Sequence, residues 1–254
     1  MKSGITYPLA HHVMKRRTVL ALSAMAATGN HFATTSAQGT PTPATNLLVK
    51  VAEQTADLDG KERLWQTNRV VVQDEEETEK FRVRLGFAYA HEIAVELDFD
   101  DDNRDDDDDG VGDDITLAIG EGTAIRNRDE IEAKPVDTSI GSFYTLELID
   151  PEDIDNSENR LAIGTPFPTG AESYTLTLWK AEATAGSTIS FGDGVANALV
   201  LVLDGSLVYT HEGGEASTLA SGEAASGSGA GQVEAGDEGS SFVVVTLTPG
   251  AAAE

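Results

Sequence analysis

The sequence predicts an all-β protein made of two similar β domains in tandem. Three observations support this prediction. Helical periodicity is hard to find after residue 46, short β-rich runs bounded by Gly, Asp and Ser are frequent, and the two halves of the chain match each other. The predicted domains span residues 46–152 and 160–250, and the polar segment 153–159 links them.

Residues 1–37 are typical of an export signal. The paired Arg16 and Arg17 precede an apolar run, 19–27, which is too short to cross a bilayer but suits a signal-peptide core. The paired arginines resemble signals of the twin-arginine route. Cleavage after Ala37 would leave a Thr/Pro-rich spacer, 38–45. We therefore expect an extracellular or cell-surface protein with no membrane insertion after cleavage; the alternative is a cytosolic protein with a mis-assigned start.

The mature part of the chain is strongly acidic. The whole chain of 254 residues has 44 acidic and 17 basic residues; four of the basic residues and none of the acids precede residue 38, which leaves 44 − 13, a net charge of −31. Such a surface repels nucleic acid and anionic lipid, so neither is an expected partner. The acidity could reflect acidic interaction tracts of a mesophile, but its spread through both halves favours a haloarchaeal-type adaptation to molar salt.

Cysteine is absent from the chain. This excludes disulfides, thiolate metal sites, a cysteine nucleophile and a lipid-modified cysteine anchor. The 40% hydrophobic content is nevertheless enough for a core.

Two runs define the expected strands. Residues 81–90 alternate, so that Phe81 and Val83 point one way while Arg82 and Arg84 point the other. Residues 197–205 are apolar almost throughout, as a strand buried on both faces would be.

The repeat is the main support for two domains. Aligning the halves sets Gly120 against Gly222. The matched segments are 64–73 with 176–186, 87–97 with 199–209, 115–124 with 217–226, and 141–151 with 240–249.

The segment 185–224, "AGSTISFGDGVANALVLVLDGSLVYTHEGGEASTLASGEA", resembles the cupin family. An Ala-Gly turn, a strand, a "VLxGxL" step and an "LxxG[DE]A" step follow each other there in the order found in cupins. The resemblance implies a double-stranded β-helix, a small jelly-roll barrel, in each half. Because cupins often pair through their sheets, it also allows a homodimer.

The resemblance does not extend to the metal ligands. In metal-binding cupins a glycine is followed, after five residues, by His-x-His and then Glu. Glycine, alanine, lysine and arginine occupy those positions here and offer no neutral N or O donor, so we expect no cofactor in either barrel. The positions are Gly192, Gly194 and Ala198 in the second half and Lys80, Arg82 and Gly86 in the first.

Histidine is equally sparse. His11, His12 and His31 lie in the predicted signal, which leaves His91 and His211. Each precedes a glutamate, but neighbours on a strand point to opposite faces and cannot readily act together. A Ser-His-Asp triad remains arithmetically possible, although no G-x-S-x-G elbow accompanies it. We interpret both histidines as ordinary strand-end or loop residues and assign no catalytic residue.

The repeat places a ten-residue acidic insertion in the first half, at about 99–114. Its Asp105, Asp107, Asp109 and Asp113 have the spacing of a calcium loop, in which carboxylates at alternate positions converge on a hard cation. Two departures favour diffuse cation condensation instead: Thr116 replaces the bidentate glutamate, and no helices are expected to flank the loop. The "SGSGAG" tract, 226–231, could line a roomy pocket or be a flexible replacement for a discarded site.

The function predicted from the sequence is that of an exported, non-catalytic, cupin-like binding or structural protein whose ligand is an unknown small molecule. One alternative is a cupin-type enzyme that acts on a small molecule or sugar through non-standard ligands. A second is a calcium-dependent surface protein.

A chelator experiment separates the two interpretations of the acidic loop. With diffuse condensation, the melting temperature at constant high salt is the same with and without chelator, because no ion is held specifically. A specific site instead lowers the melting temperature on chelation by more than about 2 °C, the shift that about 1 kcal/mol produces in a chain of this size.

Overall fold

The structure, a computed structural model, describes residues 47–72, 79–99, 114–137, 140–154 and 159–250. The predicted signal, the spacer and the calcium candidates Asp105–Asp113 lie outside these ranges. Every element described is a strand apart from one 3-10 turn, η1 (Pro151–Asp153), which confirms the all-β prediction. Among these residues there is no helix with the length and apolar character needed to span a membrane.

The first sheet has eight strands and comes mainly from the first half of the chain. Its order is β5-β4-β6-β3-β7-β2-β8, and β9 adds to β2. The bounds are β2 (Glu62–Val72), β3 (Glu79–Ala90), β4 (Val95–Phe99), β5 (Ile115–Leu117), β6 (Gly122–Pro135), β7 (Gly141–Ile149), β8 (Arg160–Ile163) and β9 (Phe167–Pro168).

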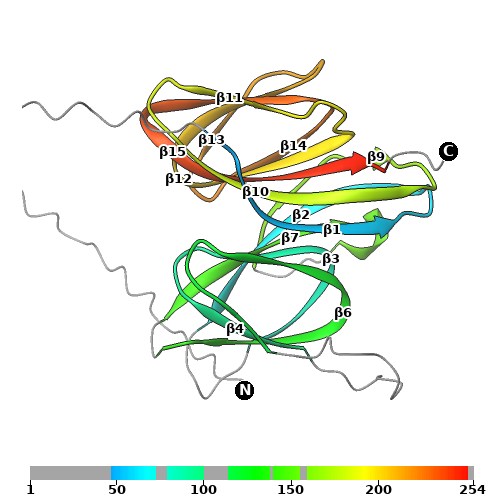
Figure 1. Ribbon diagram of the computed structural model, residues 1–254, viewed down its shortest axis with the longest axis vertical. Helices are drawn as coiled ribbons and strands as arrows, with labels where there is room; N and C mark the ends of the chain where they lie inside the picture. The colour runs from blue at the N-terminus through cyan, green and yellow to red at the C-terminus, as the bar shows by residue number, and fades with distance from the viewer. Residues whose placement is uncertain (1–46, 73–78, 100–113, 138–139, 155–158, 251–254) are drawn as a thin grey trace, which may run out of the picture. The chain divides into compact units, whose positions relative to one another are not determined.

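The second sheet has seven strands and comes mainly from the second half. Its order is β1-β10-β15-β12-β13, with β11 beside β15 and β14 beside β12 (Figure 1). The bounds are β1 (Val49–Asp57), β10 (Ser173–Ala183), β11 (Thr188–Phe191), β12 (Asn197–His211), β13 (Ser217–Ala220), β14 (Ala224–Ser228) and β15 (Gly231–Pro249).

Each half gives its leading strand to the other half. β1 falls within the predicted first domain, 46–152, but it pairs antiparallel with β10 of the second. In the same way, β8 and β9 fall within 160–250 but pair with β2. The sheets therefore do not follow the boundaries expected from the sequence, because those boundaries were drawn from the repeat and not from strand pairing.

Two long strands bend between different neighbours. The start of β12 pairs with β14 and with residues 242–247 of β15, whereas its end pairs with β13 and with residues 231–235 of β15. The register shifts between Val202 and Asp204 and again between Gly205 and Leu207, where the strand turns from one set of neighbours to the other. This arrangement lets one strand cover two sides of the same core.

Three apolar clusters hold the structure together. One lies within the first half and includes Val83, Ile131 and Phe143, and one lies within the second half and includes Ile189 and Phe242. The third joins the halves: its members are Leu58, Trp65, Phe87, Tyr89, Tyr144, Leu146, Leu148, Phe167, Tyr174, Leu176, Leu178, Leu199, Leu201, Leu203, Val243, Val245 and Leu247. We call this third cluster the central cluster.

The expected burial of residues 197–205 on both faces is confirmed for 197–203. Ala198, Val200 and Val202 pack in the second half, while Leu199 and Leu201 pack in the central cluster. The strict alternation expected for 81–90 holds only at its beginning. From Gly86 to Ala90 every residue is buried. Phe87 and Tyr89 belong to the central cluster, whereas Ala88 and Ala90 belong to the cluster within the first half.

The turns that carry the two matched glycines make the same backbone hydrogen bonds. The Gly120 N–H donates to the Ala90 carbonyl at 2.8 Å, and the Gly222 N–H donates to the Val202 carbonyl at 2.9 Å. One residue later the side chains repeat as well. Glu121 accepts from the Ala118 N–H, and Glu223 accepts from the Ala220 N–H, both at 2.9 Å. The two segments therefore have the same local turn structure, as expected if the halves are related.

The finer prediction, two tandem jelly-roll barrels, stays a prediction. Among the described strands, pairing leaves β5 and β8 as the outer strands of one sheet and β1 and β13 as those of the other. Neither sheet is closed by hydrogen bonds between its edges.

The bend of β12 gives a prediction about two glycines. Gly205 has φ +79°, and an added Cβ would lie 2.3 Å from the Gly239 carbonyl oxygen; Gly213 has φ +71° with nothing within 4 Å. Gly213→Ala should therefore lower the free energy of unfolding only by the left-handed strain, about 1–2 kcal/mol. Gly205→Ala adds a steric clash of about 1–3 kcal/mol. Equal losses in chemical denaturation would show that the close backbone approach at Gly205 does not matter.

Candidate functional site

The positions that carry metal ligands in cupins hold residues without a neutral side-chain N or O atom to bind a metal. Ala198 is in the apolar core of the second half, and Gly192 and Gly194 form a turn with positive φ. Lys80 pairs with Glu132 at 2.7 Å, and Gly86 lies against the Leu146 carbonyl. Within the ranges that the structure describes, no three His, Asp or Glu side chains gather to form a metal site.

The two histidines lie where strands end, as predicted, but both line concavities. His91 directly follows β3, and His211 is the last residue of β12. Neither is hydrogen-bonded to the glutamate that follows it. Glu92 instead accepts hydrogen bonds from Ser142 Oγ and from Arg69, each at 2.7 Å. Burial opposes ionisation, but these hydrogen bonds prevail and lower the pKa of Glu92.

A buried polar cluster occupies the inside of the first half. Glu147 is only 3% exposed, and its carboxyl oxygen Oε1 accepts from Asn68 Nδ2 and from Thr145 Oγ1, both at 2.8 Å. Its other oxygen, Oε2, accepts from the Arg84 backbone N–H at 3.2 Å. Gln66 extends the cluster by donating to Asn68 Oδ1 at 3.3 Å. A buried carboxyl group with this many donors is a fixed part of the interior.

The second half replaces this cluster with one neutral pair. Asn68 stands opposite Thr145 on β7, and at the matching place in the other sheet Trp179 stands opposite Val244 on β15. There the indole Nε1 of Trp179 donates to Thr246 Oγ1 at 3.1 Å. The first half therefore has a carboxyl network at this place, whereas the second half has one indole–hydroxyl hydrogen bond.

Two buried polar atoms in the second half have no hydrogen-bond partner in the described part of the chain: the hydroxyl of Tyr209 and Nδ1 of His211. Their rings lie 6.1 Å apart, and Tyr209 also stacks on Phe191 at 6.2 Å. Burial strongly raises the pKa of Tyr209, so its phenol keeps its proton at neutral pH.

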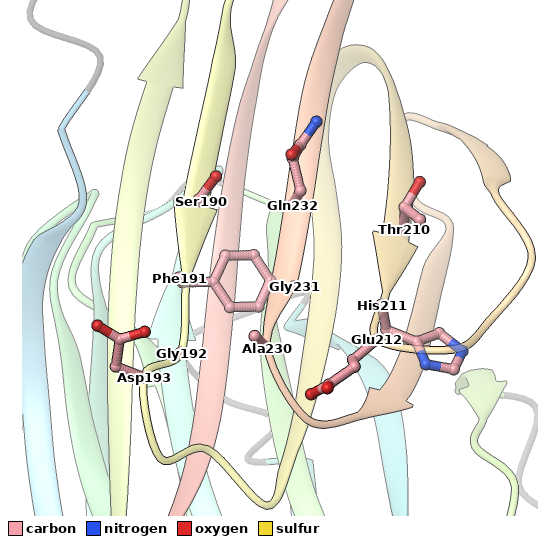
Figure 2. A pocket seen from close by; sticks show the side chains of 10 residues that line it. All are labelled: Ser190, Phe191, Gly192, Asp193, Thr210, His211, Glu212, Ala230, Gly231 and Gln232. Atoms are coloured by element: carbon pink, nitrogen blue, oxygen red, sulfur yellow. The ribbon is translucent and has the colours of Figure 1, made fainter.

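Beside these rings is an open polar concavity of about 480 Å³. Ser190, Gln232 and Thr210 stand opposite one another on β11, β15 and β12, and Figure 2 shows their side chains at one end, with the carboxylates of Asp193 and Glu212 at the other. The tract 226–231, which could have been a pocket lining, does contribute Ala230 and Gly231 here.

A larger pocket, of about 540 Å³, lies between the halves; we call it the inter-half pocket. It draws on β1, on the end of β3, on the middle of β12, on β10, on β15 and on the Gly120 turn. Its lining residues are Leu47, Val49, Tyr89, His91, Ile119, Gly120, Lys180, Ala181, Glu182, Leu203, Asp204 and Ser241.

The inter-half pocket combines an apolar rim with a polar wall. Leu47, Val49 and Ile119 are 60%, 52% and 62% exposed, which is unusual for large hydrophobic side chains gathered in one place. The polar wall includes Glu182 and Asp204. Ligand sites typically pair apolar contact surface with a few convergent polar groups, and this pocket fits that description best.

Some of the charged side chains that line the inter-half pocket already have partners. Lys180 Nζ donates to the Gly120 carbonyl at 2.8 Å, which holds the ammonium at the turn. His91 Nε2 lies 3.8 Å from Asp204 Oδ2, an ion pair only when the imidazole is protonated. Burial and the carboxylate of Glu182 raise the pKa of Tyr89. The two carboxylates therefore outnumber the one permanent cation.

Comparison with models of known protein families finds no match, and no curated protein matches the chain. Solved structures that are similar include YhaK from Escherichia coli, at 12% identity and TM-score 0.48 over 77% of this chain and 93% of that one. The coconut allergen cocosin is 9% identical, with TM-score 0.48 over 80% and 86%. A cupin 2 conserved barrel domain protein from Leptotrichia buccalis is 14% identical, with TM-score 0.38 over 79% and 91%.

The sequence did not reveal these sites. Glu147 sits in a run, 141–151, that was matched to an apolar strand, and nothing in one chain shows that its face is inward. The rim of the inter-half pocket depends on β1 crossing to β10, and strand exchange leaves no mark in composition. His91 and its glutamate were visible, but the partner Asp204 is more than a hundred residues away.

The buried cluster gives a matched pair of substitutions. Asn68→Leu removes a donor from the Glu147 carboxyl group, and leaving such a buried acceptor short of donors should lower the free energy of unfolding by about 1–3 kcal/mol. Thr246→Val removes the neutral acceptor of Trp179 and should lower it by about 1 kcal/mol. Chemical denaturation measures both. A loss for Thr246→Val that equals or exceeds the loss for Asn68→Leu would contradict the assignment of Glu147 as the more demanding group.

Proposed function

We propose that the protein is an exported, non-catalytic, cupin-like binding protein whose inter-half pocket takes a small organic cation with an apolar part. The observation that carries this proposal is the joint construction of the pocket by both halves, with exposed apolar side chains at its rim and carboxylates in its wall. Export rests on the twin-arginine signal pattern in residues 1–37, and the cupin-like fold rests on the repeat and on the motif order in 185–224.

The charge of the ligand follows from the pocket and from the whole chain. The pocket lining contains two carboxylates, Glu182 and Asp204, and one permanent cation, Lys180, whose ammonium is already hydrogen-bonded to a carbonyl. A chain with net charge −27 also concentrates cations near its surface. An organic cation gains from both effects, and its apolar part can cover Val49 and Ile119.

The alternative of an enzyme has one observation in its favour, the approach of His91 to Asp204 in a pocket that Tyr89 also lines. The Asp204 side chain is 73% exposed, however, and a carboxylate in water couples weakly to an imidazole. The pair is therefore better suited to contact a ligand than to move a proton. The calcium-dependent alternative rests on the loop tested by the chelator experiment.

The test uses benzyltrimethylammonium as the cation and benzyl alcohol as its neutral counterpart, titrated into the full chain in calorimetry at one constant salt concentration. The cation should bind and the alcohol should bind more weakly. Glu182→Gln and Asp204→Asn should each weaken the cation about fivefold, the effect of one contact of about 1 kcal/mol. Glu234→Gln, which removes the same charge from β15 outside the pocket, is the matched control.

Two results would contradict the proposal. One is equal binding of the cation and the alcohol, which would show that charge is not read. The other is an equal effect of Glu182→Gln and Glu234→Gln, which would assign the binding to the general acidity of the chain.

A further inference from the structure

We propose that a second pocket, lined by arginines where β1 reaches the first sheet, binds a small aliphatic monocarboxylate. This pocket, which we call the arginine pocket, has a volume of about 450 Å³ and is lined in part by Arg63, Arg84 and Arg126. Only 13 basic residues follow residue 38 in this acidic chain, so three in one cavity are a marked concentration. The proposal is independent of the inter-half pocket and asks for a ligand of the opposite charge.

Arg63 is the fixed member of the three. One terminal nitrogen donates to Asp59 at 2.8 Å, and the other pairs with Asp150. Asp59 also pairs with Lys61 at 3.0 Å, and the hydrogen bonds from Lys61 and Arg63 lower the pKa of Asp59 to about 2. The carboxylate thus stays charged at any ordinary pH. Arg63 Nε is buried without a hydrogen-bond partner among the described residues, so the guanidinium has an unused donor.

Arg84 and Arg126 are the members available to a ligand. Arg84 lies 3.5 Å from Asp153, and both side chains are more than a third exposed, so this pair is weak and exchangeable. Arg126 is exposed and has no ion pair in the ranges the structure describes. A guanidinium presents parallel N–H donors that match the two oxygens of a carboxylate.

The floor of the arginine pocket sets the rest of the ligand. Leu85 stands opposite Arg126 on β6 and opposite Leu148 on β7, so the arginine and two leucines form a row across three neighbouring strands. Leu58 adds a third leucine side chain to the lining. An aliphatic chain placed on these leucines gains affinity with each methylene that it buries.

Acidic groups in the lining limit the ligand to one negative charge. Asp150 and Asp153 are paired with arginines, but Asp57, at the exposed end of β1, has no ion pair in the described part of the chain. A second carboxylate on the ligand would meet this charge. The ligand class is therefore a monocarboxylate with a short hydrocarbon tail.

The test titrates hexanoate into the full chain by calorimetry at constant salt, with acetate, 1-hexanol, adipate and inorganic phosphate as comparison probes. Hexanoate should bind at least about tenfold more tightly than acetate, because the tail adds burial. It should also exceed hexanol, which lacks the charge, and adipate, which carries two. Tighter binding of phosphate, or no binding of hexanoate, would overturn the proposal.

Variants then locate the binding. Arg126→Gln should weaken hexanoate about tenfold, and Arg84→Lys should keep more affinity than Arg84→Gln because it retains the charge. Lys50→Gln removes an equal charge from the exposed face of β1 outside the arginine pocket and should have no effect. Glu182→Gln should also leave hexanoate unaffected, which separates this site from the inter-half pocket. Equal losses of hexanoate affinity for Arg126→Gln and Lys50→Gln would refute the proposed site.

Discussion

The burial of two strands on both faces is the constraint on which the rest of the structure depends. The start of β12 and the end of β15 each present one row of side chains to the second half and another row to the central cluster. Such strands are apolar at nearly every position, because neither face meets water. The edges of β15 are paired with β10 and β12, and the exchanged strands extend the two sheets further out, β1 at β10 and β8 at β2.

Side chains reinforce the exchange. From β1, the amide of Gln54 donates to the Gly86 carbonyl of the other sheet at 2.6 Å, and the indole of Trp65 donates to Asn197 of β12 at 2.8 Å. Both bonds are buried and join residues of the two sheets. Strand pairing and these side-chain bonds therefore link the two halves.

The sequence predicts those parts of the fold that depend on residues close together in the chain. The apolar run 198–203 indicates burial on both faces directly. Gly120 and Gly222 mark two similar turns, because their positive φ suits glycine. Partner choice is different. Nothing in the alternation of 49–57 says which sheet the strand joins, since any exposed edge offers the same hydrogen bonds. The candidate sites could not be predicted from the sequence either, because their walls come from segments that meet only when β1 pairs with the second sheet.

The inter-half pocket and the arginine pocket both depend on the placement of β1. Where β1 begins, Leu47 and Val49 form part of the rim of the inter-half pocket, and where it ends, Thr55 and Asp57 border the arginine pocket. A strand borrowed from the other half thus has a cavity at each end. In an acidic chain, a cation site needs little besides shape, whereas an anion site must be built against the prevailing field. In the arginine pocket, Asp59 and Asp150 hold the Arg63 guanidinium in place, so Arg84 and Arg126 are the cations that can counter this field at a ligand.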